Sequence, residues 1–150
     1  MHKRKRTNLV MIRIKIISIT ILIIILVSCS GANKECIQGI KVSELLESAT
    51  TNYSYCSLIK KSIDLDSEAL IKISTLPVFD AAGYEHGYVL INIVEKIGED
   101  KYIAIISNIK KEDKKTIKSY LEVGLEYGGN KSYKDKELKE IFPKLANHLY

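Results

Sequence analysis

The stretch that decides the fold is YVLINIVEKIGEDKYIAIISNI, at residues 88–109. It is rich in Val, Ile and Tyr, and Gly98-Glu99-Asp100 at its centre suits the turn of a β-hairpin. Its apolar residues nevertheless recur at helical spacing in both halves, as Leu90, Ile91, Val94 and Ile97, and then as Tyr102, Ile105, Ile106 and Ile109. We therefore expect two helices that meet at Gly98, because glycine commonly ends a helix. A hairpin at 88–109, within an α+β fold, is the alternative.

Two further helical patterns precede this stretch. Apolar residues at helical spacing predict one helix over 41–63, although the threonines and tyrosines near 50–55 have modest helix propensity and are able to break it. Asp66 or Ser67 then suits the N-cap of a short helix, which Pro77 brings to an end.

Two more patterns follow it. Glu112 opens a helix that ends at Gly128, and a last amphipathic segment spans 135–149 with Pro143 inside it. The sequence therefore predicts an all-α fold, a compact bundle of five or six short helices. Residues 41–150 are sufficient for a single helical domain with one core.

The N-terminus has the layout of an export signal. Residues 2–6, HKRKR, form a basic leader, and residues 16–27 are apolar except for Ser18 and Thr20. This run of 12 residues is shorter than the roughly 20 that a membrane-spanning helix needs. Charge followed by a short apolar run and small residues is typical of a secretory signal peptide. A permanent transmembrane anchor is the alternative.

The apolar run ends in Leu26-Val27-Ser28-Cys29, which resembles the lipobox of bacterial lipoproteins. The resemblance implies that residues 1–28 are a signal peptide cleaved before Cys29, and that Cys29 carries a diacylglyceryl group and an acylated amino group. Residues 29–40 are then the lipidated cysteine and a tether. Two or three acyl chains anchor a protein stably, at about 0.8 kcal/mol per buried CH₂. The expected location is the bacterial cell envelope, with the domain outside the cytoplasm and anchored to a membrane by lipid.

The positive charge of the chain belongs to this targeting segment. The whole chain has 23 Lys and Arg against 18 Asp and Glu, a formal net charge of +5. Six of the basic residues and none of the acidic ones precede Cys29, so residues 29–150 hold 17 basic and 18 acidic side chains. The mature domain therefore lacks the basic excess that indicates nucleic-acid binding, and we expect no nucleic-acid partner.

Two cysteines, Cys36 and Cys56, remain after Cys29. Outside the cytoplasm an even pair of cysteines indicates a disulfide, with two separate thiols as the alternative. A bond between them would close a loop of about 20 residues, which the chain-entropy account values at roughly 3 kcal/mol.

The stretch DAAGYEHG, at residues 80–87, holds the candidate functional side chains. As a reactive loop it would use His86 as a general base, oriented by Asp80 or Glu85, with Tyr84 as a hydrogen-bond donor. This chemistry also needs a nucleophile or a metal, and the sequence places neither beside it.

The same stretch also suits a structural connection. Gly83 would turn the chain, Glu85 would support the start of a helix, and Gly87 would let another helix approach closely. His86 and Tyr84 would then lie at the domain surface, where they are able to contact another protein.

No motif of catalytic or metal chemistry appears after Cys29. The histidines there are His86 and His148, and the sequence contains no His-x-x-x-His, Cys-x-x-Cys, Gly-x-Ser-x-Gly or phosphate-binding glycine loop. The sequence therefore predicts no metal, no cofactor and no enzymatic activity.

A small, lipid-anchored helical domain is similar in layout to the periplasmic immunity proteins, which neutralise toxins of rival bacteria. The helical immunity proteins against secreted peptidoglycan amidases carry a cysteine in their first helix, as Tyr55-Cys56-Ser57 does here, although their partner cysteine lies near the C-terminus. The resemblance implies a protein-binding domain whose partner is a toxin or another envelope protein, with tyrosines at the interface. An envelope hydrolase using His86 and a structural envelope lipoprotein are the alternatives.

Overall fold

Residues 88–109 are helical in the computed structural model, which describes residues 33–150 apart from 51, 52 and 129. Helix α5 (Asp80–Ile97) ends at Gly98, and helix α6 (Glu99–Ile106) begins directly after it. Gly98 has a φ of 86°, in the left-handed region that favours glycine. The prediction of two helices is confirmed, and the hairpin at 88–109 is not formed. The signal peptide and Cys29 lie outside the described residues.

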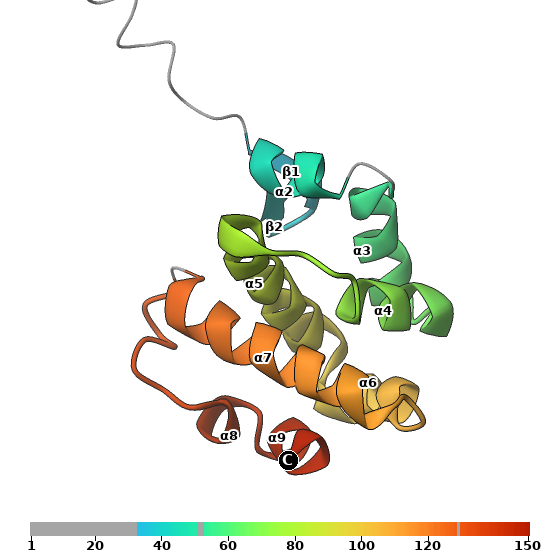
Figure 1. Cartoon of the computed structure of the whole chain (residues 1–150), viewed down its shortest axis with the longest axis vertical. Helices are drawn as coiled ribbons and strands as arrows, with labels where there is room; N and C mark the ends of the chain where they lie inside the picture. The colour runs from blue at the N-terminus through green and yellow to red at the C-terminus, as the bar shows by residue number, and fades with distance from the viewer. Residues whose placement is uncertain (1–32, 51–52, 129) are drawn as a thin grey trace, which may run out of the picture. The chain divides into compact units, whose positions relative to one another are not determined.

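Helix α5 runs through the core and is flanked along its length by α7 (Lys111–Tyr127) (Figure 1). Its central residues, Val89, Leu90, Ile91, Ile93 and Val94, are all fully buried. The two helices touch through backbone at Gly87 and Gly124, where a Cβ on either glycine would overlap backbone atoms of the other helix. The close approach expected at Gly87 is therefore confirmed. Burial on nearly every side explains why α5 carries few charges.

A two-stranded antiparallel sheet precedes the helices, and the all-α prediction is wrong at this point. Strands β1 (Lys34–Ile37) and β2 (Ile40–Val42) are joined by a turn in which Gly39 has a φ of 85°. Their inward side chains, Cys36, Ile40 and Val42, belong to the core. The tether expected at 29–40 therefore does not extend through these strands, since the folded unit already begins at Asn33.

The single helix expected over 41–63 is divided into β2 and two helices, α2 (Glu44–Ala49) and α3 (Tyr55–Ile63). Ser43 caps α2, and its hydroxyl accepts a hydrogen bond of 3.2 Å from the amide of Leu46. Helix α4 (Ser67–Ser74) follows, and the Asp66 side chain caps it by accepting from the amide of Ala69.

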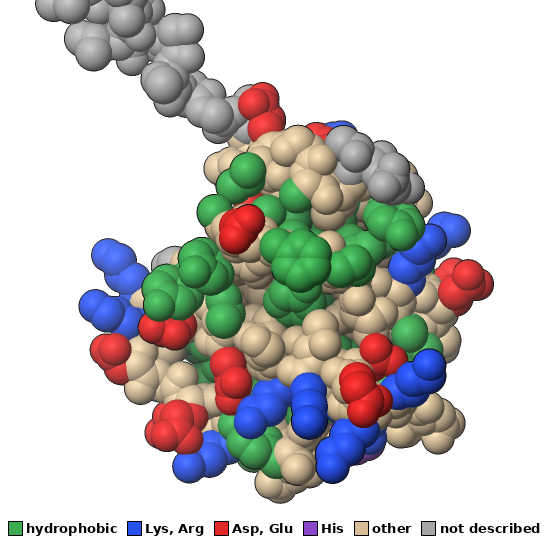
Figure 2. Space-filling model, in the orientation of Figure 1, with side chains coloured by type: hydrophobic (Ala, Val, Ile, Leu, Met, Phe, Trp, Pro, Cys, Tyr) green, Lys and Arg blue, Asp and Glu red, His purple; other side chains and the backbone are tan. Residues whose placement is uncertain are grey.

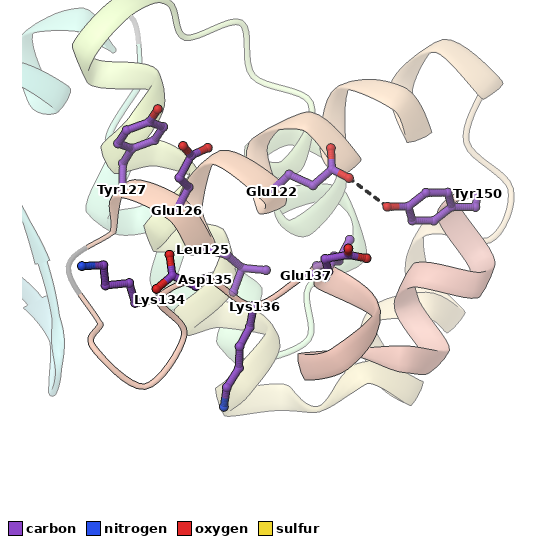
Figure 3. Close-up of a pocket in the computed structure, with 10 residues that line it drawn as sticks. Glu122, Leu125, Glu126, Tyr127, Lys134, Asp135, Lys136, Glu137 and Tyr150 are labelled. Atoms are coloured by element: carbon purple, nitrogen blue, oxygen red, sulfur yellow. Dashed lines mark hydrogen bonds between the residues drawn. The ribbon is translucent and has the colours of Figure 1, made fainter.

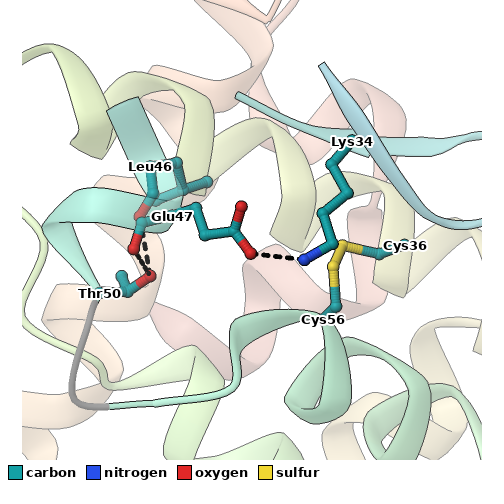
Figure 4. A network of polar contacts seen from close by, with 6 residues as sticks. All are labelled: Lys34, Cys36, Leu46, Glu47, Thr50 and Cys56. Carbon is teal, nitrogen blue, oxygen red and sulfur yellow. Dashed lines mark hydrogen bonds and ion pairs between the residues drawn. A yellow bond between two sulfur atoms is a disulfide. The ribbon is translucent and has the colours of Figure 1, made fainter. Parts of the chain in front are cut away.

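The hairpin is fastened to the helices by a disulfide and by polar contacts (Figure 4). Cys36 of β1 and Cys56 of α3 are bonded, with their Cα atoms 5.0 Å apart. The Lys34 ammonium lies 2.6 Å from the Glu47 carboxylate of α2, and the Thr50 hydroxyl closes the end of α2 by donating to its carbonyls. The disulfide thus connects the first strand to the second described helix, and the predicted bond between the two cysteines is present.

The C-terminal pattern forms two short helices, α8 (Leu138–Ile141) and α9 (Pro143–Leu149). Pro143 is the first residue of α9, where a missing N–H costs nothing. The first-turn acids of α6 hold α9: Glu99 accepts from the Leu145 amide at 2.8 Å, and Asp100 pairs with Lys144 at 2.7 Å.

The described residues are therefore mostly helical, with eight helices rather than five or six and one small sheet. In Figure 1 the hairpin and α2 lie at one end of the domain, and α8 and α9 lie at the other. Across the described ranges, no helix has both the length and the apolar character needed to cross a membrane.

Candidate binding surface

The stretch DAAGYEHG forms the first two turns of helix α5, so the prediction of a loop here is wrong. Successive residues of a helix point in directions about 100° apart, which divides the four candidate side chains. Asp80 and Tyr84 are exposed, whereas Glu85 is half-buried and His86 is fully buried. The structure therefore does not bring the four together as one site.

His86 lies in the core and not at the domain surface. Its Nδ1 atom shares a hydrogen bond of 2.5 Å with the Tyr55 hydroxyl, and its ring meets the ring of Tyr120 edge-on at 4.7 Å. Within the described residues, its Nε2 atom has no hydrogen-bond partner. Burial lowers the pKa of His86 from 6.5 to about 4, although the nearby backbone of Ile73 opposes this shift. The imidazole is therefore neutral and out of reach of a substrate.

Glu85 joins helix α5 to the start of α2. Its carboxylate accepts a hydrogen bond of 2.6 Å from the Ser43 amide and a second one from the Ser43 hydroxyl. Because Ser43 is also the N-cap of α2, this carboxylate positions the helix next to α5. Glu85 has a structural role here, and it also contributes to the raised pKa of buried Tyr55, which arises first from desolvation.

The segment between α4 and α5 is held by one hydroxyl group. Tyr120 of α7 accepts a hydrogen bond of 2.9 Å from the Val78 amide and donates to the carbonyls of Leu76 and Val78, each at 3.0 Å. Val78 is buried by this arrangement, whereas the next residue, Phe79, is 74% exposed. The linker is therefore fixed with an aromatic ring facing solvent.

Three aromatic side chains near the N-terminal end of α5 form what we call the aromatic surface: Phe79, Tyr84 and Tyr127. Tyr84 and Tyr127 stack with ring centroids 4.9 Å apart, yet each remains about half exposed. Asp80 directly follows Phe79 in the chain. Its φ of 55° is uncommon for a residue other than glycine. Figure 2 shows hydrophobic side chains gathered over this end of α5 and the neighbouring α2.

A groove adjoins the aromatic surface at Tyr127 (Figure 3). It has a volume of about 600 Å³ and lies between the C-terminal half of α7 and residues 134–138. Leu125 and Leu138 are buried beneath it, and Tyr127 and Tyr150 stand at its two ends. Four carboxylates line it, from Glu122, Glu126, Asp135 and Glu137.

Sequence reasoning identified Asp80 and Tyr84 but missed Phe79, Tyr127 and the groove. Phe79 follows Pro77 and belongs to none of the apolar stripes of the predicted helices, which was the one sequence sign that its side chain is exposed. Tyr127 had a comparable signal, since it falls next to Gly128 at the end of its helix. The proximity of Tyr127 to Tyr84 depends on the packing of α5 against α7, which no local pattern reveals.

The fold and this surface define a small, disulfide-linked, mostly helical domain with an exposed aromatic face. Within the described ranges, no three His, Cys, Asp or Glu side chains lie close enough together to hold a metal ion. Comparisons with protein-family models, curated proteins and solved structures find no match to this chain.

Proposed function

We propose that this chain is a bacterial lipoprotein of the cell envelope, anchored to a membrane by lipid on Cys29, whose compact helical bundle binds another protein outside the cytoplasm. The signal layout and the lipobox-like Leu26-Val27-Ser28-Cys29 support export and lipidation. The disulfide between Cys36 and Cys56 supports an oxidising compartment, because such bonds are rare in the cytosol.

The proposed anchor would keep the domain close to the bilayer. Strand β1 begins at Lys34, five residues after Cys29. A fully extended chain spans at most about 3.6 Å per residue, so these residues reach no more than roughly 18 Å. A protein that this domain binds would therefore meet it at the membrane.

The lipid anchor is tested by replacing Cys29. We expect the wild-type chain to incorporate labelled palmitate and to sediment with membranes, and Cys29→Ala to lose both properties, because the replaced residue lacks the sulfur that forms the thioether. Replacing Ser30 with Ala is the matched control and should leave labelling unchanged. Continued labelling and signal cleavage in Cys29→Ala would exclude this part of the proposal.

The aromatic surface is the observation that carries the binding function. Tyrosine and other aromatic residues dominate the energetic centres of protein interfaces, because they bury much area with few rotatable bonds. Here the hydrogen bond between the Val78 amide and the Tyr120 hydroxyl fixes the linker so that Phe79 faces solvent. The ring of Tyr127 stacks against the ring of Tyr84. The resemblance in layout to immunity proteins suggests a toxin as the partner, and another envelope protein is the second candidate.

Binding is tested by capture from envelope extracts of the producing bacterium, with the full-length chain in a non-ionic detergent as bait. We expect the double variant Phe79→Ala with Tyr84→Ala to weaken capture of a specific protein at least about tenfold, since each truncated hot-spot residue costs 1–2 kcal/mol or more. Tyr53→Ala is the matched control, because Tyr53 is an exposed tyrosine outside the aromatic surface.

Equal capture by all three chains would contradict binding through the aromatic surface. Capture of nothing by the wild-type chain would instead favour a structural envelope lipoprotein. The contacts of His86 do not favour the alternative of a hydrolase that uses this residue, because its side chain is buried against Tyr55 and Tyr120.

A further inference from the structure

The groove between Tyr127 and Tyr150 is predominantly acidic. Its lining includes four carboxylates, from Glu122, Glu126, Asp135 and Glu137, and two lysines, Lys134 and Lys136. Figure 3 shows the ammonium groups of the two lysines extending away from the carboxylates. The interior of the groove therefore presents negative charge over an apolar floor.

The carboxylates differ in how far they are already engaged. Glu122 accepts a hydrogen bond of 2.9 Å from the Tyr150 hydroxyl, and Glu137 pairs with Lys139 at 2.8 Å. Within the described residues, no hydrogen bond or ion pair holds the side chain of Asp135, which is exposed. Asp135 is thus the acid best placed to receive a cation from outside. Glu126 is also exposed and lines the same groove, where its contact with the Tyr127 hydroxyl raises the pKa of Tyr127.

One end of the groove already binds a lysine of the chain itself. The ammonium of Lys118 lies 3.6 Å from the centroid of the Tyr150 ring and 3.7 Å from the Glu122 carboxylate. The combination of an aromatic face and a carboxylate is a favourable environment for an ammonium or guanidinium group. At the other end, Tyr127 and Glu126 offer the same two components, and Tyr127 is 58% exposed although its ring stacks on that of Tyr84.

We propose that the groove receives a lysine- or arginine-bearing segment of the protein partner, with a cationic side chain between the Tyr127 ring and the carboxylates of Glu126 and Asp135. This inference rests on the proposed protein-binding function and specifies the chemistry of the partner. The volume of about 600 Å³ lies within the ~300–1,000 Å³ typical of ligand pockets, and it accommodates a few residues of an extended chain. Complementary charge would also guide the orientation of the partner on the adjoining aromatic surface.

The probe for this proposal is a dye-labelled peptide of alternating Lys and Gly, titrated into the full-length chain in non-ionic detergent and followed by fluorescence anisotropy. A peptide of alternating Glu and Gly, of equal length, is the reference. At low ionic strength we expect the basic peptide, and not the acidic one, to bind saturably. This binding should be lost near 0.5 M salt, where screening shortens the reach of exposed charges to a few ångströms.

Variants locate the binding within the groove. The double variant Glu126→Gln with Asp135→Asn keeps side-chain shape, and Asn tolerates the left-handed backbone at position 135. This double variant should bind the basic peptide with an affinity about fivefold lower, in line with the loss of two exposed charge pairs. Tyr127→Leu should lower the affinity for the basic peptide about threefold, through loss of the cation–π contact.

The matched control is Asp64→Asn with Glu68→Gln, which removes two exposed acids at the turn between α3 and α4, outside the groove. No saturable binding, equal binding of the acidic peptide, or an equal loss in the control variant would each overturn the proposal. The protein-binding function is judged separately by the Phe79 and Tyr84 variants. If capture depends on Phe79 and Tyr84 but the basic peptide does not bind, the proposal of a cationic segment is excluded and the protein-binding function is retained.

Discussion

Replacing Gly87 with alanine is expected to lower the free energy of unfolding by about 3 kcal/mol or more. The added Cβ would lie well inside van der Waals contact of the Tyr120 carbonyl oxygen and 2.9 Å from the Gly124 amide nitrogen. Both are backbone atoms of α7, so relief requires the two helices to separate and not a rotamer change. In an open helix the same substitution would instead add stability, by up to about 1 kcal/mol. The sign of the result therefore reports on the helix contact.

The measurement is urea unfolding of the wild-type and variant chains. Gly83→Ala is the matched control on the same helix, because its Cβ would lie 3.1 Å from the Val78 carbonyl oxygen, a contact that a small shift relieves. We expect Gly83→Ala to change stability by no more than about 1 kcal/mol. If Gly87→Ala proved as stable as this control, α5 and α7 would not be in backbone contact in solution.

Acidification from pH 6.5 to pH 4 is expected to remove about 3 kcal/mol of stability through His86 alone. The unfolded chain binds a proton at His86 below its ordinary pKa of 6.5, whereas burial lowers the pKa in the folded domain to about 4. The unfolded state therefore binds more protons throughout this window, and stability falls as the pH falls. Well below pH 4 the contribution of His86 becomes constant, since both states are then protonated.

The titration is isolated by comparing unfolding free energies across this pH range in three chains. His86→Gln keeps a polar side chain beside Tyr55 but cannot be protonated, so its stability should vary much less between pH 6.5 and pH 4. His148→Gln is the control, because His148 is only half-buried and should contribute less of the pH dependence. An equal loss of stability on acidification in wild type and His86→Gln would show that His86 is solvated.

The helices whose ends carry their own signals could be predicted from the sequence. Asp66, Gly98 and Pro143 each satisfy a local requirement of a helix terminus, and each stands where the structure begins or ends a helix. The ambiguity at 88–109 was resolved by the spacing of apolar residues, which remained helical through both halves. Local chemistry and global packing agree at these positions.

The hairpin could not be predicted in the same way. Its strands contain four and three residues, too few to display an alternating pattern. They are stabilised by non-local contacts, namely the disulfide to α3 and burial of Ile40 and Val42 in the common core. Residues 41–63 accordingly show one helical apolar pattern, in which the modest helix propensity near 50–55 was the local sign of the break between α2 and α3.

The candidate site illustrates a second limit. Asp80, Tyr84, Glu85 and His86 are close in sequence, and closeness suggested a shared task. A continuous helix instead sends His86 into the core and Tyr84 to the surface. The partner of Tyr84 lies 43 positions further along the chain, at Tyr127, because two glycines allow α5 and α7 to pack in contact.

Helix α7 fixes both sides of the aromatic surface. At position 120 its tyrosine hydroxyl holds the linker that directs Phe79 outward, and at position 127 its terminal ring supports Tyr84. The separation between these points is set by a rigid helix and not by mobile loops. The surface is therefore preorganised, and an incoming protein would lose little conformational entropy in ordering it. Such an interface favours slow dissociation over rapid exchange with any protein that binds it.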